Sequence, residues 1–190
     1  RAQGIPVLAL TSIETYPDVR STLTLLGELF AQQAESARLL ADLDARVEKL
    51  KASWPTRPRL RLLVYSNDGT GGWAAGSQTT ANAMIQLCGL RNAAAEAGLQ
   101  GHKQIDLERL FEFDPDAFVV AAPASGEGGS PTVAVLESSG TLRNLRAVRK
   151  QRIAVLPAAL LSADSPRLVD AAEKLAAELD RIFAGLESAG

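Results

Sequence analysis

The residues that could do chemistry lie mainly in one glycine-rich stretch, Asn67 to Gly76 (NDGTGGWAAG), and at the single histidine, His102. Glycines let backbone amides approach a phosphate closely. However, the stretch contains no Gly-Lys-Ser/Thr, and its glycines do not fit the G-x-G-x-x-G spacing of a dinucleotide site. Because it follows an apolar strand predicted over Leu60 to Tyr65, we expect a loop at the carboxyl end of a parallel strand, where open sheets place their ligand crevice. Trp73 in this loop is either a pocket wall or a core plug.

Hydrolytic chemistry would have to use His102, and the surrounding residues do not favour it. Ser125 and Ser130 stand in glycine-rich sequence, but neither lies in a G-x-S-x-G elbow. Cys88, the only cysteine, falls on a predicted helix with a buried apolar face, which disfavours a reactive thiol. One histidine without clustered carboxylates cannot build a metal site from protein ligands alone. His102 is therefore either an exposed loop residue or a group facing a bound chelate or ring, and no cofactor or resident metal is expected.

The totals of the sequence exclude several classes of protein. The 190 residues include 20 basic and 22 acidic side chains, so the basic footprint of a nucleic-acid binder is missing. One cysteine rules out an internal disulfide framework. No apolar run reaches the roughly 18 residues of a membrane-spanning helix. The composition is typical of a globular protein with one large or two small domains, and no nucleic acid and no membrane span are expected.

The element that positions everything else is a long helix predicted from Ala34 to Trp54. Its apolar residues recur at steps of three and four, which predicts a helix with one packed face and a length of roughly 30 Å. The opposite side, expected to be a solvated outer face, carries Arg38, Asp42, Asp44, Arg46, Glu48, Lys49 and Lys51. A long helix packed along one side only suggests a spine joining two bodies. An ordinary layer helix of an α/β domain is the alternative.

The segments before and after this long helix differ in the secondary structure that they predict. From residue 59 onward, apolar strands alternate with amphipathic helices, which predicts a three-layer α/β/α lobe with a central, mainly parallel sheet. Before the spine, Gly4 to Leu10 reads as a strand buried on both faces, and a helix with Val19 and Phe30 on its buried face follows a start signal at Thr15. One strand and one helix have no sheet to join. We therefore expect residues 1–33 to be the remnant of a first lobe.

The order of several segments resembles the second half of the periplasmic binding proteins that serve ABC importers of ferric siderophores, haem and cobalamin. The resemblance covers nearly the whole chain, and its most specific pieces are a glutamate helix running into a Pro-Asp strand start and an Ala-Val-x-x-x-Arg-Ile turn. The segments that carry it are GIPVLAL, AGSQTTANAMIQLCGLRNAAAEAGLQG, IDLERLFEFDPDAFVV, TLRNLRAVRKQRIAVLP and SPRLVDAAEKLAAEL.

The resemblance implies a domain organisation and a function. It implies that residues 1–33 are the tail of an amino-terminal lobe, 34–54 a rigid interlobe helix and 55–190 the carboxyl-terminal lobe. A periplasmic protein or extracytoplasmic lipoprotein would then deliver an iron chelate or a cobalamin-like ligand to an ABC permease in the inner membrane, with haem as the alternative ligand. Glu108 would dock to that permease, and the ligand-binding residues implied are Ser66, Asn67, Asp68, Trp73, His102, Lys103, Ser125 and Leu160.

Two other classes of function remain open at this point. A small α/β enzyme would use the loop from Asn67 to Gly76 and would need a complete pocket with convergent titratable groups. A stand-alone interaction domain would use the exposed part of residues 1–33 as a dimer interface. The receptor hypothesis predicts an open half of a cleft instead.

Overall fold

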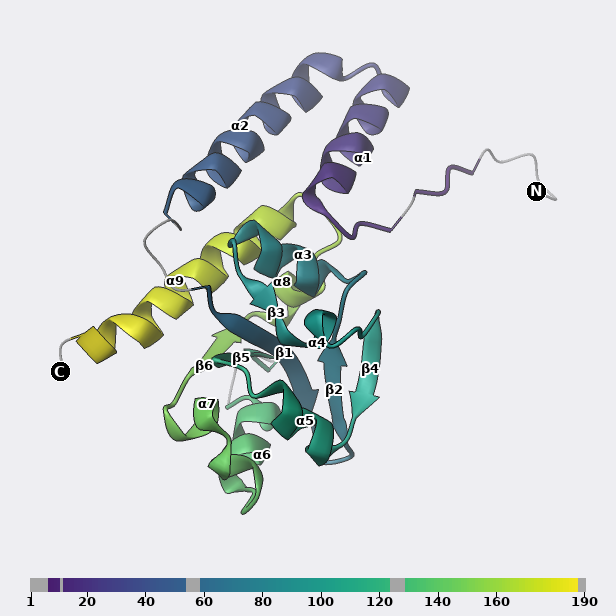
Figure 1. Ribbon diagram of the computed structural model, residues 1–190. Coiled ribbons are helices and arrows are strands. Elements are labelled where there is room, and N and C mark those ends of the chain that lie inside the picture. The colour runs from purple at the N-terminus through teal and green to yellow at the C-terminus, as the bar shows by residue number, and fades with distance from the viewer. Residues whose placement is uncertain (1–6, 11, 54–58, 124–128, 188–190) are drawn as a thin grey trace.

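The computed structural model describes residues 7–10, 12–53, 59–123 and 129–187. Helices cover both faces of a central sheet, and a helical hairpin stands off from this lobe at the amino-terminal side (Figure 1). The architecture is a mixed α/β fold with a mainly parallel sheet, as the sequence predicts.

The sheet has six strands in the described part of the chain, in the order β4-β2-β1-β5-β6, with β3 beside the first residues of β1. β1 pairs in parallel with β3 and β5, and β5 pairs in parallel with β6. β2 and β4 add an antiparallel extension on the other side of β1. The strands are β1 (Arg61–Asn67), β2 (Gly72–Ala75), β3 (Arg91–Asn92), β4 (His102–Ile105), β5 (Ala117–Ala121) and β6 (Ile153–Leu156).

The helices agree closely with the periodicity of the sequence. Thr79 caps α3 by accepting a hydrogen bond from the backbone of Asn82, and Asp106 caps α5 in the same way through Arg109. The helices are α1 (Tyr16–Leu29), α2 (Gln33–Ala52), α3 (Thr80–Leu87), α4 (Ala93–Glu96), α5 (Leu107–Phe113), α6 (Pro131–Ser138), α7 (Arg146–Arg149), α8 (Ala158–Leu161) and α9 (Arg167–Glu187), with a 3-10 turn at Leu142–Asn144.

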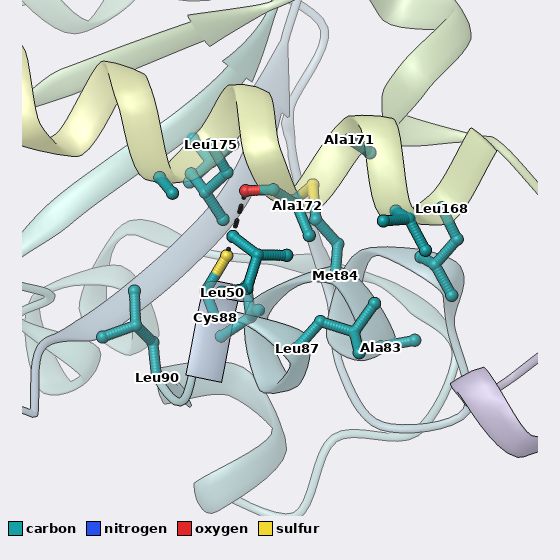
Figure 2. Close-up of a cluster of buried hydrophobic side chains, with 14 of the residues drawn as sticks. Leu50, Ala83, Met84, Leu87, Cys88, Leu90, Leu168, Ala171, Ala172 and Leu175 are labelled. Carbon is teal, nitrogen blue, oxygen red and sulfur yellow. Dashed lines mark hydrogen bonds between the residues drawn. The ribbon is translucent and has the colours of Figure 1, made fainter. Parts of the chain in front are cut away.

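Alternate residues of the central strands face two separate cores. In β5, Ala117 and Val119 pack on one side with α3 and α9, whereas Phe118 and Val120 pack on the other side with α5 and α6. This is why the run reads as continuously apolar in the sequence. Cys88 is fully buried in the first core, and Figure 2 shows its thiol directed at the carbonyl of Ala172 on α9, at 3.2 Å.

Helix α2 confirms the predicted long helix and is fastened to the lobe. Leu43, Val47 and Leu50 enter the first core. Arg46 makes hydrogen-bonded ion pairs with Asp170 and Glu173 of α9, both with contacts of 2.6 Å. The prediction that Arg46 lies on a solvated face was therefore wrong. The local sequence could not reveal these ion pairs, because Asp170 and Glu173 lie far from Arg46 in the chain. The pKa of Arg46 is raised by these hydrogen bonds, Glu173 first.

Helix α1 packs closely against α2 where Gly27 faces Ser36. A Cβ atom at Gly27 would lie 2.6 Å from the Cβ of Ser36, so the two backbones can come this close only because residue 27 is glycine. Asp44 accepts a hydrogen bond from the Tyr16 hydroxyl at 2.8 Å and pairs with Arg20. Asp44 was also predicted to lie on the solvated face. It instead joins the two helices into one hairpin.

The amino-terminal segment departs most from expectation. Residues 7–10 form no strand, and the side chains of Val7, Leu8 and Leu10 are exposed, so the predicted buried strand is wrong for the described part of that segment. A strand needs neighbours to satisfy its backbone, and the described chain offers none here. The start of α1 is as predicted, with Val19 buried, but Phe30 is 65% exposed and not part of a buried face.

Candidate ligand-binding surface

The stretch from Asn67 to Gly76 is not the loop that the sequence predicts. Residues 72–75 form β2, which turns back antiparallel to β1. Gly72 makes this pairing possible, because a Cβ atom there would overlap the ring of Tyr65. The β-hairpin formed by β1 and β2 therefore places part of the glycine-rich stretch in the sheet, where its side chains alternate between the two faces.

This alternation brings three of the predicted ligand-binding residues to one face. Ser66 lies opposite Trp73, and His102 lies opposite Ala75. Trp73 and Ala75 are two residues apart on β2, so all four point to the same side of the sheet. They line a pocket of about 170 Å³ that opens at the carboxyl-terminal half of β1, together with Ala81 of α3, Leu161 at the end of α8 and Ser162 directly after it.

Trp73 is a pocket wall and not a core plug, since 46% of it is exposed. His102 begins β4 and is also exposed, at the edge of the same pocket. An aromatic surface beside an imidazole suits a large planar or anionic ligand. Whether Trp73, His102 and Ser66 bind a ligand remains a prediction.

The side chains of Asn67 and Asp68 make hydrogen bonds at the turn between β1 and β2. Asn67 donates a hydrogen bond to the Tyr65 hydroxyl at 2.9 Å and accepts one from the backbone of Gly69 at 2.8 Å. Asp68 accepts hydrogen bonds from the hydroxyl and the backbone of Thr70, and these bonds lower its pKa. The structure does not bring either residue to the pocket, and their predicted contact with ligand remains untested.

Lys103 lies on the opposite face from His102, because the two are consecutive in β4. It pairs with Ala74 and lines a separate groove of about 450 Å³ with Gln104 and Arg109. The side chains of consecutive strand residues point to opposite faces of the sheet, and Lys103 does not line the pocket that His102 lines. The predicted grouping of Lys103 with His102 therefore ignored the strand period.

The remaining predicted contacts fall elsewhere. Leu160 is partly buried against the first core, while its neighbours Leu161 and Ser162 line the pocket. Ser125 lies outside the described residues. The sequence analysis did not predict that Leu161 and Ser162 line the pocket, because only their position after β6 distinguishes them in the sequence. Glu108, predicted to dock to a permease, is exposed in the first turn of α5.

The described residues hold no group of three or more His, Cys, Asp or Glu side chains that could bind a metal ion. Among the same residues, no helix is long and apolar enough to cross a membrane.

Comparison with known proteins agrees with the resemblance read from the sequence. A family model described as "Periplasmic binding protein" matches residues 1–160. The chain is 25% identical over 177 residues to the uncharacterized ABC transporter substrate-binding lipoprotein YvrC of Bacillus subtilis, covering 91% of this chain and 53% of the relative. The chain thus spans about half the length of that curated relative.

Two solved structures are similar over nearly the whole chain. One is a periplasmic haem-binding protein from Pseudomonas aeruginosa, with 28% identity, a TM-score of 0.77, and coverage of 96% of this chain and 65% of that one. The other is an ABC-type Fe³⁺-hydroxamate transport protein from Saccharomonospora viridis, with 27% identity, a TM-score of 0.77, and coverage of 96% and 63%. The family is extracytoplasmic, in agreement with the predicted localisation. By its family match over residues 1–160, with which its fold and these relatives agree, the chain belongs to the periplasmic binding protein family.

Proposed function

We propose that the chain forms the carboxyl-terminal lobe and interlobe helix of a solute-binding receptor that delivers a metal chelate or corrinoid to an ABC import permease. In this proposal residues 1–33 end a first lobe, 34–54 form the rigid connection and 55–190 form the second lobe. The observation that carries it is the open pocket with Trp73, His102 and Ser66 on one face.

The size of this pocket supports a shared binding site. Its volume is about 170 Å³, whereas pockets that enclose a drug-sized ligand measure roughly 300–1,000 Å³. A chelate or corrinoid would therefore rest against Trp73 and need a second wall. A first lobe facing this one would supply that wall.

The apolar surface of the amino-terminal region supports the same conclusion. Phe30 at the tip of the helical hairpin is 65% exposed and Val7 is 82% exposed. Seven of the ten exposed large hydrophobic side chains of the described residues belong to the amino-terminal segment and the helical hairpin, more than exposed apolar residues scattered singly would give. The proposed first lobe would cover these residues and would give residues 7–10 the neighbouring strands that they lack.

The attachment of α2 supports a receptor whose lobes move little against each other. Arg46 and the leucines of α2 fix the helix to α9, while Asp44 and Gly27 fix α1 to α2. A continuous helix held at both ends resists hinge bending. Ligand capture would then depend on two preformed walls.

Among ligands we favour a ferric siderophore or a cobalamin-like corrinoid, and haem is the second candidate. The specific observation in favour of haem is His102 at the pocket edge, where its imidazole could approach an axial position of a bound iron. The similar Saccharomonospora structure is of a hydroxamate transport protein and the similar Pseudomonas structure is of a haem binder. Both ligand classes therefore enter the test.

The proposal is tested by titrating the full-length protein with ferrioxamine B, cyanocobalamin and haemin, using tryptophan fluorescence and calorimetry. We expect one of them to bind, and Trp73→Ala to weaken that binding about tenfold or more, because a half-exposed aromatic wall would be lost. Trp54→Phe, which removes the other tryptophan of this chain, is the control and should leave the affinity unchanged. Absence of binding by all three ligands, or an unchanged affinity in Trp73→Ala, would contradict the proposal.

Docking to the permease is the second half of the proposed function. Glu108 is exposed in the first turn of α5, where it could pair with a basic side chain and guide orientation. Glu108→Gln should weaken docking of the full-length protein to its permease at low salt. The exposed Glu137 of α6 provides a matched control, because Glu137→Gln removes the same charge from another helix.

A further inference from the structure

Strand β4 forms one free edge of the sheet. It pairs with β2 on one side, and within the described part of the chain no strand pairs with its other side. Figure 1 shows β4 at the outer margin of the lobe. An edge strand presents backbone N–H and C=O groups that have no partner in the sheet. These groups are available to bind another extended chain.

The register of the sheet shows which backbone groups of β4 point outward. The N–H of Asn67 donates to the Thr132 hydroxyl at 2.9 Å, so the backbone of this residue faces away from β2. Successive residues of an antiparallel strand direct their backbone groups to alternate sides. Counting through the paired residues of β1, β2 and β4 then turns the N–H and C=O of Gln104 away from the sheet. The hydrogen bond from the N–H of Gly76 to the carbonyl of Gly101, at 2.9 Å, fits the same alternation.

A groove of about 450 Å³ follows this edge. Lys103 and Gln104 both line it, although their side chains point to opposite faces of the sheet, so the groove crosses the edge itself. Its apolar lining comes from Leu99 and Ile105, which are buried in the second core. The volume lies within the roughly 300–1,000 Å³ of pockets that enclose a ligand. The groove is therefore large enough to hold a short extended segment.

Among the described residues, the charged side chains that line the groove are all positive. They are Lys103 and Arg109, and neither makes an ion pair with another described residue. Asp106 follows β4 directly, but its carboxylate is engaged as the cap of α5, where it accepts a hydrogen bond from the backbone of Arg109 at 2.8 Å. Two uncompensated cations beside outward-facing backbone groups favour an anionic occupant.

Both cations lie on the side of the sheet that faces the second core. Lys103 pairs with Ala74, which is buried in that core, and Leu110 holds α5, the helix of Arg109, against the same core. In a strand added beside β4, alternate side chains would lie on this side. An occupant with carboxylates at alternate positions therefore complements the groove. A second copy of β4 does not, because residues 102–105 include no acid.

We propose that the free edge of β4 binds an extended acidic peptide segment. The segment adds a strand beside β4, exchanges backbone hydrogen bonds with Gln104 and directs alternate carboxylates to Lys103 and Arg109. Addition of a strand to a free edge is a recurrent mode of peptide recognition, in which backbone bonds supply affinity and alternate side chains supply specificity. The inference does not depend on the ligand proposed for the pocket beside Trp73.

The test titrates the full-length protein with a blocked synthetic peptide in which threonine and glutamate alternate. We expect saturable binding that weakens as salt is raised, because salt screens ion pairs. A peptide with glutamine in place of glutamate should bind about tenfold more weakly, since two ion pairs are lost and each exposed pair changes an equilibrium constant by roughly fivefold at most. The glutamate peptide methylated on its backbone nitrogens keeps its charge and should not bind, because it has no N–H to donate to β4.

Variants of the protein test the two cations. Lys103→Gln/Arg109→Gln should weaken binding of the glutamate peptide about tenfold and leave binding of the glutamine peptide unchanged. Arg149→Gln/Lys150→Gln is the matched control, because it removes the same charge from two exposed positions at the end of α7. This control should bind the glutamate peptide as the wild type does. The melting temperature should be unchanged in both double variants.

Three results would overturn the inference. The wild-type protein could fail to bind the glutamate peptide. The methylated peptide could bind as well as the unmodified one, in which case the groove recognises carboxylates of any small anion and no strand is added. The variant Lys103→Gln/Arg109→Gln could self-associate in gel filtration while the wild type binds no peptide, in which case the two cations only keep the edges of two copies apart.

Discussion

The carboxyl-terminal lobe and the amino-terminal helical hairpin differ in how completely their apolar side chains are buried. In the lobe, alternate residues of each central strand enter two cores, so that Phe118 and Leu62 are both fully buried. In the hairpin, α1 buries Val19 and Gly27 only, and Phe30 remains exposed. The lobe is complete in itself, whereas the hairpin has the sequence of a buried element without the structure that would bury it. The contrast agrees with the proposal that a first lobe would cover the hairpin.

The largest effect is expected from one substitution made in each region. Phe118→Ala should destabilise the chain by about 3–5 kcal/mol, because it leaves a cavity in the core beside Tyr65. Phe30→Ala should change stability by less than about 0.5 kcal/mol in the 190-residue chain, because its ring is exposed. Denaturant unfolding measures both. Equal losses would remove the distinction between the regions.

A second prediction concerns the contact between α1 and α2. Gly27→Ala should cost about 1–3 kcal/mol, because the new Cβ atom would lie 2.6 Å from the Cβ of Ser36. The effect should appear as faster amide hydrogen exchange in α1 and not in the lobe. Gly140→Ala is the control, since a Cβ atom there meets nothing within 4 Å. Faster exchange throughout the lobe would show that the hairpin is not a separate packing unit.

A third prediction concerns the link between the hairpin and the lobe. Arg46→Ala should destabilise the chain by about 1–2 kcal/mol, because Asp170 and Glu173 would lose a shared, charge-assisted partner. Arg38→Ala removes an exposed pair with Glu35 at 3.5 Å and should have little effect. Thermal unfolding of the two variants compares them directly. If they behave alike, α2 is not fastened to α9 by Arg46.

The smallest effect on stability is expected from the titration of Tyr16 at high pH. Burial, and then the hydrogen bond to Asp44, raises the pKa of Tyr16 to about 12. An unfolded tyrosine titrates near pH 10. The stabilisation from Tyr16 is therefore complete below about pH 10 and is lost as the pH rises towards 12. Absorbance titration of the phenolate in a Tyr65→Phe background measures Tyr16 alone, and Asp44→Asn should move its midpoint partly back towards 10.

How far the sequence could predict this structure depends on the range of the interactions. The long helix and the alternation of apolar strands with helices from residue 59 onward follow from local periodicity and were predicted correctly. Arg46 was misplaced because its partners lie more than a hundred residues away, and local patterns carry no information about them.

The pocket was predictable in part. Its position after β1 followed from the rule for parallel sheets, and Trp73 and His102 were named from their residue types. The hairpin of β1 and β2 was missed because its glycines are typical of a loop, although Gly72 serves strand pairing. Once β4 is known, the period of two separates His102 from Lys103.

The most direct test of the two-lobe account is amide hydrogen exchange at residues 7–10, compared between the 190-residue chain and the full-length protein. We predict fast exchange in the isolated chain, where these residues form no strand, and strong protection in the full-length protein, where they would join the sheet of the first lobe. Equally fast exchange in both proteins would contradict the account.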